Sequence, residues 1–153
     1  FFKLAQGEYV TPERVENIYL SNNPLLTQLF VHGDSFSNFL IGIAGIDPVG
    51  VKNFLQSHYK GEINSIDDVL KLLESPKFKK LVLNEISKNI SKSDLQGYEK
   101  LHNLHFELEP LTIENEALTP SFKLKRNAAR QVHKDKIEQL YKEGSLIKPR
   151  TKL

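Results

Sequence analysis

Two short apolar runs, at residues 29–31 and 39–43, place the strongest limit on how this chain can fold. They read Leu-Phe-Val and Phe-Leu-Ile-Gly-Ile, and the turn formers Gly33 and Asp34 lie between them. A strand with one solvated face alternates apolar and polar residues, whereas these runs are apolar almost throughout. The sequence therefore predicts two neighbouring strands in a sheet that is covered on both faces.

Helix-start signals precede several amphipathic stretches that can supply this cover. Thr11-Pro12 and Ser75-Pro76 each combine an N-cap hydroxyl with proline at the first helical position, and Ser65 predicts a further cap. Asp47-Pro48 ends the second strand and leads into a short helix. The apolar residues expected to face inward from these helices are Val15, Ile18, Tyr19, Val51, Phe54, Leu55, Ile66, Val69, Leu70, Leu73, Phe78, Leu81, Val82 and Ile86.

The second half of the chain adds one strand and one helix. Leu104, Phe106 and Leu108 alternate with polar residues, which predicts a third strand with one apolar face. An apolar stripe predicts a single final helix from residue 126 to about residue 141, and Gly7 predicts an N-terminal hairpin. The expected fold class is α+β: a small, mostly antiparallel sheet of about three strands plus the hairpin, flanked by helices.

Composition limits the function classes. The 153 residues are 39% hydrophobic and 26% charged, which suits one folded domain rather than a disordered chain. A net charge of +2 argues against nucleic acid as a partner, and the absence of cysteine excludes disulfides and thiolate sites. No apolar run approaches the roughly 20 residues of a membrane-spanning helix. The chain contains no methionine, so we expect it to be part of a longer protein.

The most informative stretch for function is residues 118–126, Leu-Thr-Pro-Ser-Phe-Lys-Leu-Lys-Arg. Pro120 and its polar neighbours predict an exposed loop. Lys123 follows this loop in a short extended piece, and the final helix begins at Arg126. A flexible loop fixed to a helix can move an ammonium group into and out of a site. On charge alone, the simpler interpretation is that this lysine and its basic neighbours form a solvated surface.

Residues 118–126 resemble the late signature of the long-chain acyl-CoA synthetases, in the adenylate-forming (AMP-binding) superfamily. Residues 2–13, Phe-Lys-Leu-Ala-Gln-Gly-Glu-Tyr-Val-Thr-Pro-Glu, resemble the segment just after the interdomain hinge of that family, and residues 97–99 also fit. The resemblance covers nearly the whole chain. It implies the mobile C-terminal domain of a long-chain or medium-chain fatty acyl-CoA synthetase of the fungal peroxisomal kind, at residues 1–143, with a flexible basic tail at residues 144–153.

The resemblance implies a ligase reaction in two halves. A fatty-acid carboxylate attacks the α-phosphate of ATP and releases pyrophosphate, and the thiol of coenzyme A then displaces AMP. The implied partners are the fatty acid and an upstream N-terminal adenylation domain that holds most of ATP, Mg and the acyl chain, with no nucleic acid. The chain alone should catalyse neither step, and a peripheral membrane association of the full enzyme is left open.

For the first half-reaction, the motif makes Lys123 the adenylation lysine. An ammonium on a flexible stem can bridge carboxylate and phosphate oxygens as negative charge develops. Lys125 and Arg126 would bind the anionic nucleotide, with solvated charges as the alternative. Phe122 stands where the wider superfamily usually has glycine, and we interpret this difference as a mark of the subfamily.

For the second half-reaction, the family rotates this domain and presents the opening hairpin to coenzyme A. Gly7 would let the ligand lie against the backbone, because glycine has no Cβ; the alternative is an ordinary turn glycine. Lys3, Glu8 and Tyr9 accompany Gly7 in the motif, so we expect them to shape the loop or contact the cofactor.

Two further features have weaker assignments. His102 and His105 are three apart on a predicted strand and should face opposite sides, so we predict no metal site. Thr151-Lys152-Leu153 resembles a C-terminal peroxisomal address of the Ser-Lys-Leu type, which predicts a peroxisomal protein, with a cytoplasmic or membrane-associated one as the alternative. The competing function is a non-catalytic module whose basic helix, residues 126–142, binds anionic lipid or nucleic acid with a steep salt dependence.

Overall fold

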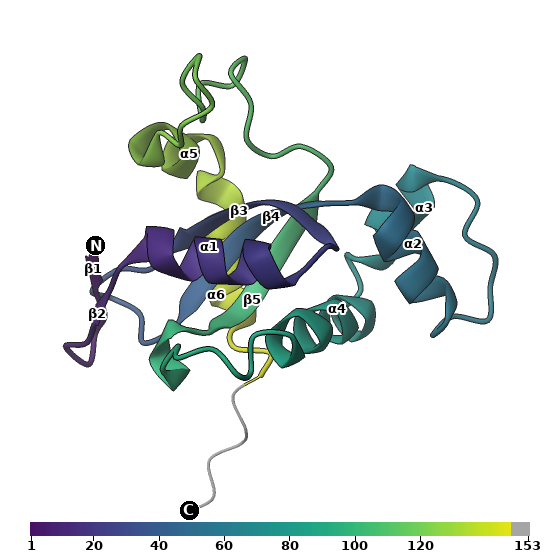
Figure 1. Ribbon diagram of the computed structural model, residues 1–153, viewed down its shortest axis with the longest axis horizontal. Coiled ribbons are helices and arrows are strands. Elements are labelled where there is room, and N and C mark those ends of the chain that lie inside the picture. Colours follow the sequence, from purple (N-terminus) through teal and green to yellow (C-terminus); the bar gives the residue numbers. More distant parts are fainter. Residues whose placement is uncertain (148–153) are drawn as a thin grey trace, which may run out of the picture.

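A computed structural model describes residues 1–147 of the chain (Figure 1). Its centre is a three-stranded sheet of order β3-β4-β5, with bounds Leu26–His32, Leu40–Ile46 and Leu101–Glu107. A separate ribbon pairs β1, Phe2–Lys3, with β2, Tyr9–Val10. The expected α+β class with a small sheet and an N-terminal hairpin is confirmed. The β1–β2 and β3–β4 pairs are antiparallel, as expected, whereas β5 runs parallel to β4, so the three-stranded sheet is mixed.

The parallel pair follows from the long connection between its strands. The crossover contains α2 (Pro48–Gln56), α3 (Ile66–Leu72), α4 (Pro76–Lys88) and a 3₁₀ turn (Gly97–Glu99). A parallel pair needs such a crossover, whereas an antiparallel pair can be joined by a tight turn. The remaining helices are α1 (Pro12–Asn22), α5 (Arg126–Val132) and α6 (Lys134–Glu143).

Helices cover both faces of the sheet, as the two apolar runs predict. Every residue of β4 is buried, and its side chains alternate between two core clusters. On one face Ala44 lies in a cluster with Tyr19 of α1 and Val82 of α4, and on the other Ile43 shares a cluster with Ile137 of α6. Figure 1 shows α1 in front of the sheet, α4 below it next to β5, and α6 behind it.

The proline signals give the correct helix starts, but their hydroxyl caps are only partly confirmed. Proline stands in the first turn of α1, α2 and α4. The side chains of Ser65 and Asp47 accept backbone hydrogen bonds from Asp68 and Gly50. Thr11 and Ser75 occupy N-cap positions without a side-chain cap bond, so the predicted hydroxyl caps are wrong there.

The predicted single helix over residues 126–141 is wrong, because α5 and α6 meet at His133. The buried imidazole of His133 lies 2.8 Å through Nε2 from the carbonyl oxygen of Pro110, a contact that the helical periodicity does not reveal. Two residues predicted to be inward are exposed instead: Ile66 (43%) and Leu108 (40%), which lies one residue past the end of β5.

The fold continues past α6. The amide of Leu146 donates to the carbonyl of His102 at 2.8 Å, and Leu146 and Ile147 pack against the core. Residues 148–153, which include the predicted peroxisomal address, lie outside the described residues. Within residues 1–147, no helix is both long enough and apolar enough to cross a bilayer.

Candidate functional site: two hairpins and a shared helix

The stretch that carries Lys123 is a closed hairpin, which we call the lysine hairpin (residues 117–125). The amide of Lys125 donates to the carbonyl of Ala117, and the amide of Thr119 donates to the carbonyl of Lys123, both at 2.8 Å. Leu118 and Leu124 form an isolated antiparallel bridge between these bonds. The loop is exposed as predicted, but its backbone pairing gives it a defined shape that the sequence did not predict.

Lys123 lies at the exposed tip of the lysine hairpin. Its backbone amide donates to Thr119 Oγ1 at 3.0 Å, which fixes where the side chain leaves the backbone. Within residues 1–147 its ammonium group has no hydrogen-bond or ion-pair partner. Phe122, immediately before it, has a left-handed backbone with φ 65°. The tip therefore presents a free cation to solvent from a hydrogen-bonded turn.

Arg126, one residue past the lysine hairpin, anchors it to α1. Its Nη2 and Nη1 donate to Glu16 Oε1 and Oε2 at 2.6 and 3.0 Å, and Glu16 Oε2 also accepts the Val31 amide at 2.8 Å. The guanidinium lies 5.8 Å from the centre of the Phe30 ring, and its Nε is 3.5 Å from Glu13. Glu16 is the carboxylate that balances this charge, so Arg126 is part of the framework of the hairpin, while Lys125 is exposed.

The opening hairpin, residues 1–10, carries the other predicted residues. Gly7 has φ 96°, a conformation that favours glycine, and nothing lies within 4 Å of where a Cβ would be. The amide of Ala5 donates to the Ser37 carbonyl at 3.0 Å, which docks the hairpin on the β3–β4 loop. Lys3 Nζ lies 5.7 Å from the centre of the Tyr9 ring. The hairpin thus offers open backbone at Gly7 beside a cation and an aromatic ring.

Glu8 lies in the same hairpin and shapes it. Its carbonyl accepts the amide of Leu4 at 2.8 Å, and its carboxylate accepts Gln6 Nε2 at 2.9 Å. The same Gln6 amide group donates to the carbonyl of Asn38 at 3.1 Å. Glu8 therefore contributes to the turn and, through Gln6, to its docking on the β3–β4 loop.

The two hairpins lie in different places around the sheet and share one helix. Figure 1 shows the lysine hairpin with α5 at the top and the β1–β2 ribbon at the left. Helix α1 starts two residues after β2, and its second turn carries Glu16, which holds Arg126. The predicted residues therefore lie in two separate places on the domain and do not share a single pocket.

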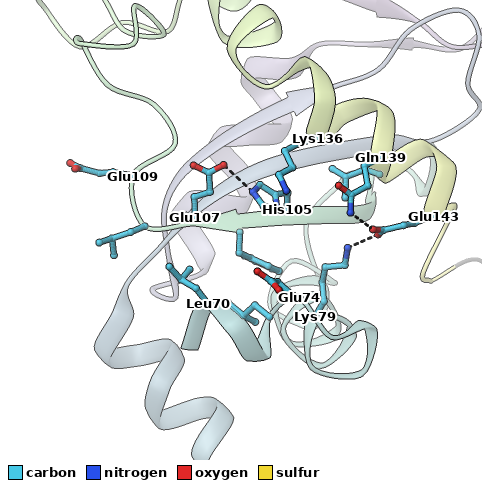
Figure 2. A pocket seen from close by; sticks show the side chains of 13 residues that line it. Leu70, Glu74, Lys79, His105, Glu107, Glu109, Lys136, Gln139 and Glu143 are labelled. Carbon is cyan, nitrogen blue, oxygen red and sulfur yellow. Dashed lines mark hydrogen bonds and ion pairs between the residues drawn. The ribbon is translucent and has the colours of Figure 1, made fainter. Parts of the chain in front are cut away.

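A charged cleft of about 760 Å³ lies elsewhere, between β5, α6 and the crossover helices (Figure 2). Lys79 pairs with Glu143 at 2.7 Å, and His105 lies 2.9 Å from Glu107 (Figure 2). This hydrogen bond from His105 holds the pKa of Glu107 below its ordinary value. None of the predicted site residues lines the cleft, and these close pairs satisfy one another. We interpret them as structural.

The histidines of β5 do not act together. His102 Nδ1 lies 2.8 Å from Ser145 Oγ and its ring stacks on Phe39, whereas His105 interacts with Glu107. Among residues 1–147, no group of three or more His, Cys, Asp or Glu side chains is placed to hold a metal ion.

The chain is similar in sequence to known acyl-CoA ligases and synthetases. No family model matches the chain. It is 36% identical over 144 residues to the peroxisomal acyl-CoA ligase 891 of Penicillium roqueforti, covering 93% of this chain and 20% of the relative. It is 38% identical to long chain acyl-CoA synthetase 2 of Arabidopsis thaliana, over 94% of this chain and 21% of that protein. It is 37% identical to human long-chain-fatty-acid–CoA ligase 6, over 92% of this chain and 19% of that protein.

The fold is similar to parts of solved adenylation domains. The adenylation domain of a carboxylate reductase from Mycobacterium chelonae superposes with a TM-score of 0.67 at 27% identity, over 92% of this chain and 19% of that one. A didomain of a carboxylic acid reductase from Segniliparus rugosus, solved with AMP, gives a TM-score of 0.66 at 26% identity, over 92% of this chain and 17% of that one.

The chain is therefore a homologue of the C-terminal part of adenylate-forming enzymes. Within that superfamily, its relatives are the long-chain acyl-CoA synthetases and ligases, as residues 2–13 and 118–126 predict. The chain spans about a fifth of the length of the curated relatives it matches. These matches give no support to the alternative of a free-standing basic module.

Proposed function

We propose that this domain serves a fatty acid–CoA ligase, which joins a fatty acid to coenzyme A through an acyl-adenylate. The observation that carries the proposal is the free ammonium of Lys123, held at the exposed tip of a hydrogen-bonded hairpin in the segment with the adenylation motif. Several of the similar ligases act, by their names, on long-chain fatty acids. The rest of the active site would lie in an upstream domain.

In the first half-reaction a carboxylate oxygen of the fatty acid attacks the α-phosphorus of ATP, and pyrophosphate leaves. Two anions must be held together while charge builds on the phosphorus. The ammonium of Lys123 would bind oxygens of both groups, and its flexible stem suits a group that enters a site held by another domain. An AMP complex of a structural neighbour is consistent with nucleotide chemistry beside this kind of domain.

In the second half-reaction the thiol of coenzyme A attacks the acyl carbon, and AMP leaves. We propose that the domain rotates and places the opening hairpin against the thiol-bearing arm. The open backbone at Gly7 allows a narrow ligand to lie close, and Lys3, Glu8 and Tyr9 would shape or line its path. Rotation would exchange the two hairpins at one site, because both are held on the same domain: the opening hairpin by the β3–β4 loop and the lysine hairpin by α1.

The other basic residues take different parts in this proposal. Lys125 is exposed and can attract the anionic nucleotide. Arg126, with its charge balanced by Glu16, would act on the nucleotide only at longer range and would mainly hold the lysine hairpin. Among residues 1–147, no cluster of three or more His, Cys, Asp or Glu side chains could hold Mg. In this proposal the upstream domain binds Mg together with ATP.

We also propose a peroxisomal location, since several relatives are named as peroxisomal. A peripheral membrane association of the full enzyme remains a proposal of the same kind, because the fatty-acid substrate is itself drawn to bilayers.

The test is Lys123→Ala in the full-length protein. We expect fatty-acid-dependent ATP–pyrophosphate exchange to fall about a hundred- to a thousand-fold, because one charge-stabilising group is lost. Conversion of supplied acyl-adenylate to the thioester should be largely kept. Lys60→Ala removes another exposed lysine, outside both hairpins, and should change neither rate. Equal exchange in Lys123→Ala and wild type would refute the assignment.

A further inference from the structure

Phe122 combines two features that are individually unusual. Its backbone is left-handed, with φ 65°, a region that a residue with a bulky side chain rarely adopts. Its side chain is 71% exposed, and within residues 1–147 its ring stacks on no other aromatic ring. Within residues 1–147, therefore, no aromatic stacking offsets the strain of its backbone, and most of the residue is left open to solvent.

The position of Phe122 links it to the chemistry of its neighbour. Adjacent Cα atoms are about 3.8 Å apart, so wherever Lys123 goes, Phe122 goes as well. If the lysine ammonium enters a site in another domain, the hairpin tip must approach the protein surface around that site. An exposed aromatic ring at the tip would then lose its contact with water, which is favourable for apolar surface.

The hairpin can transmit such a contact because its base is fixed. The Thr119–Lys123 and Ala117–Lys125 backbone bonds hold its two arms together, and the Arg126–Glu16 pair ties its end to α1. A ring docked at the tip thus sets the place of the lysine and of the whole hairpin.

We propose that the ring of Phe122 is an apolar anchor: it packs on the upstream adenylation domain while the acyl-adenylate forms and so positions Lys123. This proposal rests on the function proposed above. The occupant is a protein surface of the same parent chain, since about four-fifths of the length of the relatives lies outside this match and the lysine must be delivered to that part. Phe122 is a positioning residue and touches no reacting atom.

The experiment uses the full-length protein, with ATP, pyrophosphate and palmitate for exchange and palmitoyl-adenylate with coenzyme A for thioester formation. Phe122→Asn removes the ring and keeps a residue that tolerates left-handed backbone. Phe122→Tyr keeps the ring. The matched control is Glu116→Asn, at the other left-handed non-glycine residue of the described chain (φ 67°), which is also exposed.

We expect Phe122→Asn to lower exchange about ten- to a hundred-fold, because a small misplacement of a catalytic group is costly in rate. Thioester formation should stay within about two-fold of wild type, and the melting temperature of the chain should not fall. Phe122→Tyr should restore most of the exchange, and Glu116→Asn should change neither half-reaction.

Exchange at the wild-type rate in Phe122→Asn would overturn the inference. An equal loss in both half-reactions, or a lowered melting temperature, would also overturn it, because either result indicates a merely structural role for the ring. The two proposals fail separately. If Lys123→Ala loses exchange and Phe122→Asn does not, only the anchor is wrong. If Lys123→Ala keeps exchange, the proposed function of the hairpin is wrong as well.

Discussion

The lysine hairpin and the opening hairpin both contain a residue with a left-handed backbone, but the residue type differs. Each turns through a left-handed residue at its exposed end: Gly7 in the opening hairpin, with φ 96°, and Phe122 in the lysine hairpin, with φ 65°. Glycine adopts this backbone without strain and leaves the surface bare, whereas phenylalanine accepts strain and adds a large ring. The first tip suits a ligand that lies against the backbone, and the second suits the delivery of side chains.

Their attachment differs in the same way. The opening hairpin is docked by hydrogen bonds to backbone carbonyls, through Ala5 and Gln6, on the loop between β3 and β4. The lysine hairpin depends on the Arg126–Glu16 ion pair, whose carboxylate side chain is only 8% exposed. A buried charge pair is specific in geometry but vulnerable, because removing one partner strands the other. The lysine hairpin should therefore be the easier of the two to detach.

The largest effect is expected from Arg126→Ala. Glu16 would be left as a buried carboxylate without its main partner, which should lower the free energy of unfolding by about 3 kcal/mol. Denaturation by urea measures this loss. Arg126→Lys keeps the charge but not the two-pronged hydrogen bonding, so its loss should be smaller. Equal stability of Arg126→Ala and wild type would show that the ion pair does not hold the hairpin.

A pair of opposite changes at the two tips should give the next largest effects. Gly7→Ala forces a Cβ into a left-handed turn and should destabilise the chain by about 1–2 kcal/mol, although no atom lies within 4 Å to clash with it. Phe122→Gly should remove strain and leave the stability unchanged or raise it by up to about 1 kcal/mol. Both are read from urea denaturation. The same sign for both changes would contradict the comparison.

The same substitutions should divide the two half-reactions in the full-length protein. Gly7→Ala should slow thioester formation from supplied acyl-adenylate, by about ten-fold, while exchange is largely kept. Phe122→Gly should have the reverse pattern. A uniform loss in either variant would mean that the hairpins are not separate sites.

Sequence reasoning finds the parts of this arrangement that are local. Proline at the start of α1, α2 and α4 predicts these helices because its fixed φ and missing donor fit a first turn. The apolar runs predict β3 and β4 because burial on both faces removes the alternation of polar residues. Lys123 and Gly7 are assigned roles only through motifs, since neither has a local pattern that distinguishes it from a surface lysine or a turn glycine, and these roles stay predictions.

The parts that sequence reasoning misses depend on contacts between distant residues. Arg126 meets Glu16 across 110 positions, so nothing near either residue indicates that the arginine is paired. The break between α5 and α6 falls at His133, whose buried ring contacts a carbonyl 23 positions earlier, at Pro110. The left-handed backbone of Phe122 is set by the closure of the lysine hairpin, and propensity alone argues against it.

The smallest effect is expected in the charged cleft, which tests whether function is confined to the hairpins. The pKa of Glu107 is lowered by its hydrogen bond from His105, so its ionised form is favoured more in the folded chain than in the unfolded one. This contribution is present above the ordinary carboxyl pKa and is lost as the pH falls through the lowered value. Glu107→Gln should therefore make the free energy of unfolding less dependent on pH below about 4.5.

The carboxylate is 38% exposed, so solvent screens the interaction and the change should be small. Urea denaturation of Glu107→Gln and wild type, repeated between neutral and acidic pH, measures it. In the full-length protein at neutral pH, both half-reactions should be unaffected, because the cleft contains no residue of either hairpin. A selective loss of one half-reaction would instead show that the cleft takes part in that step. The two hairpins would then not be the only parts of this domain that act in the reaction.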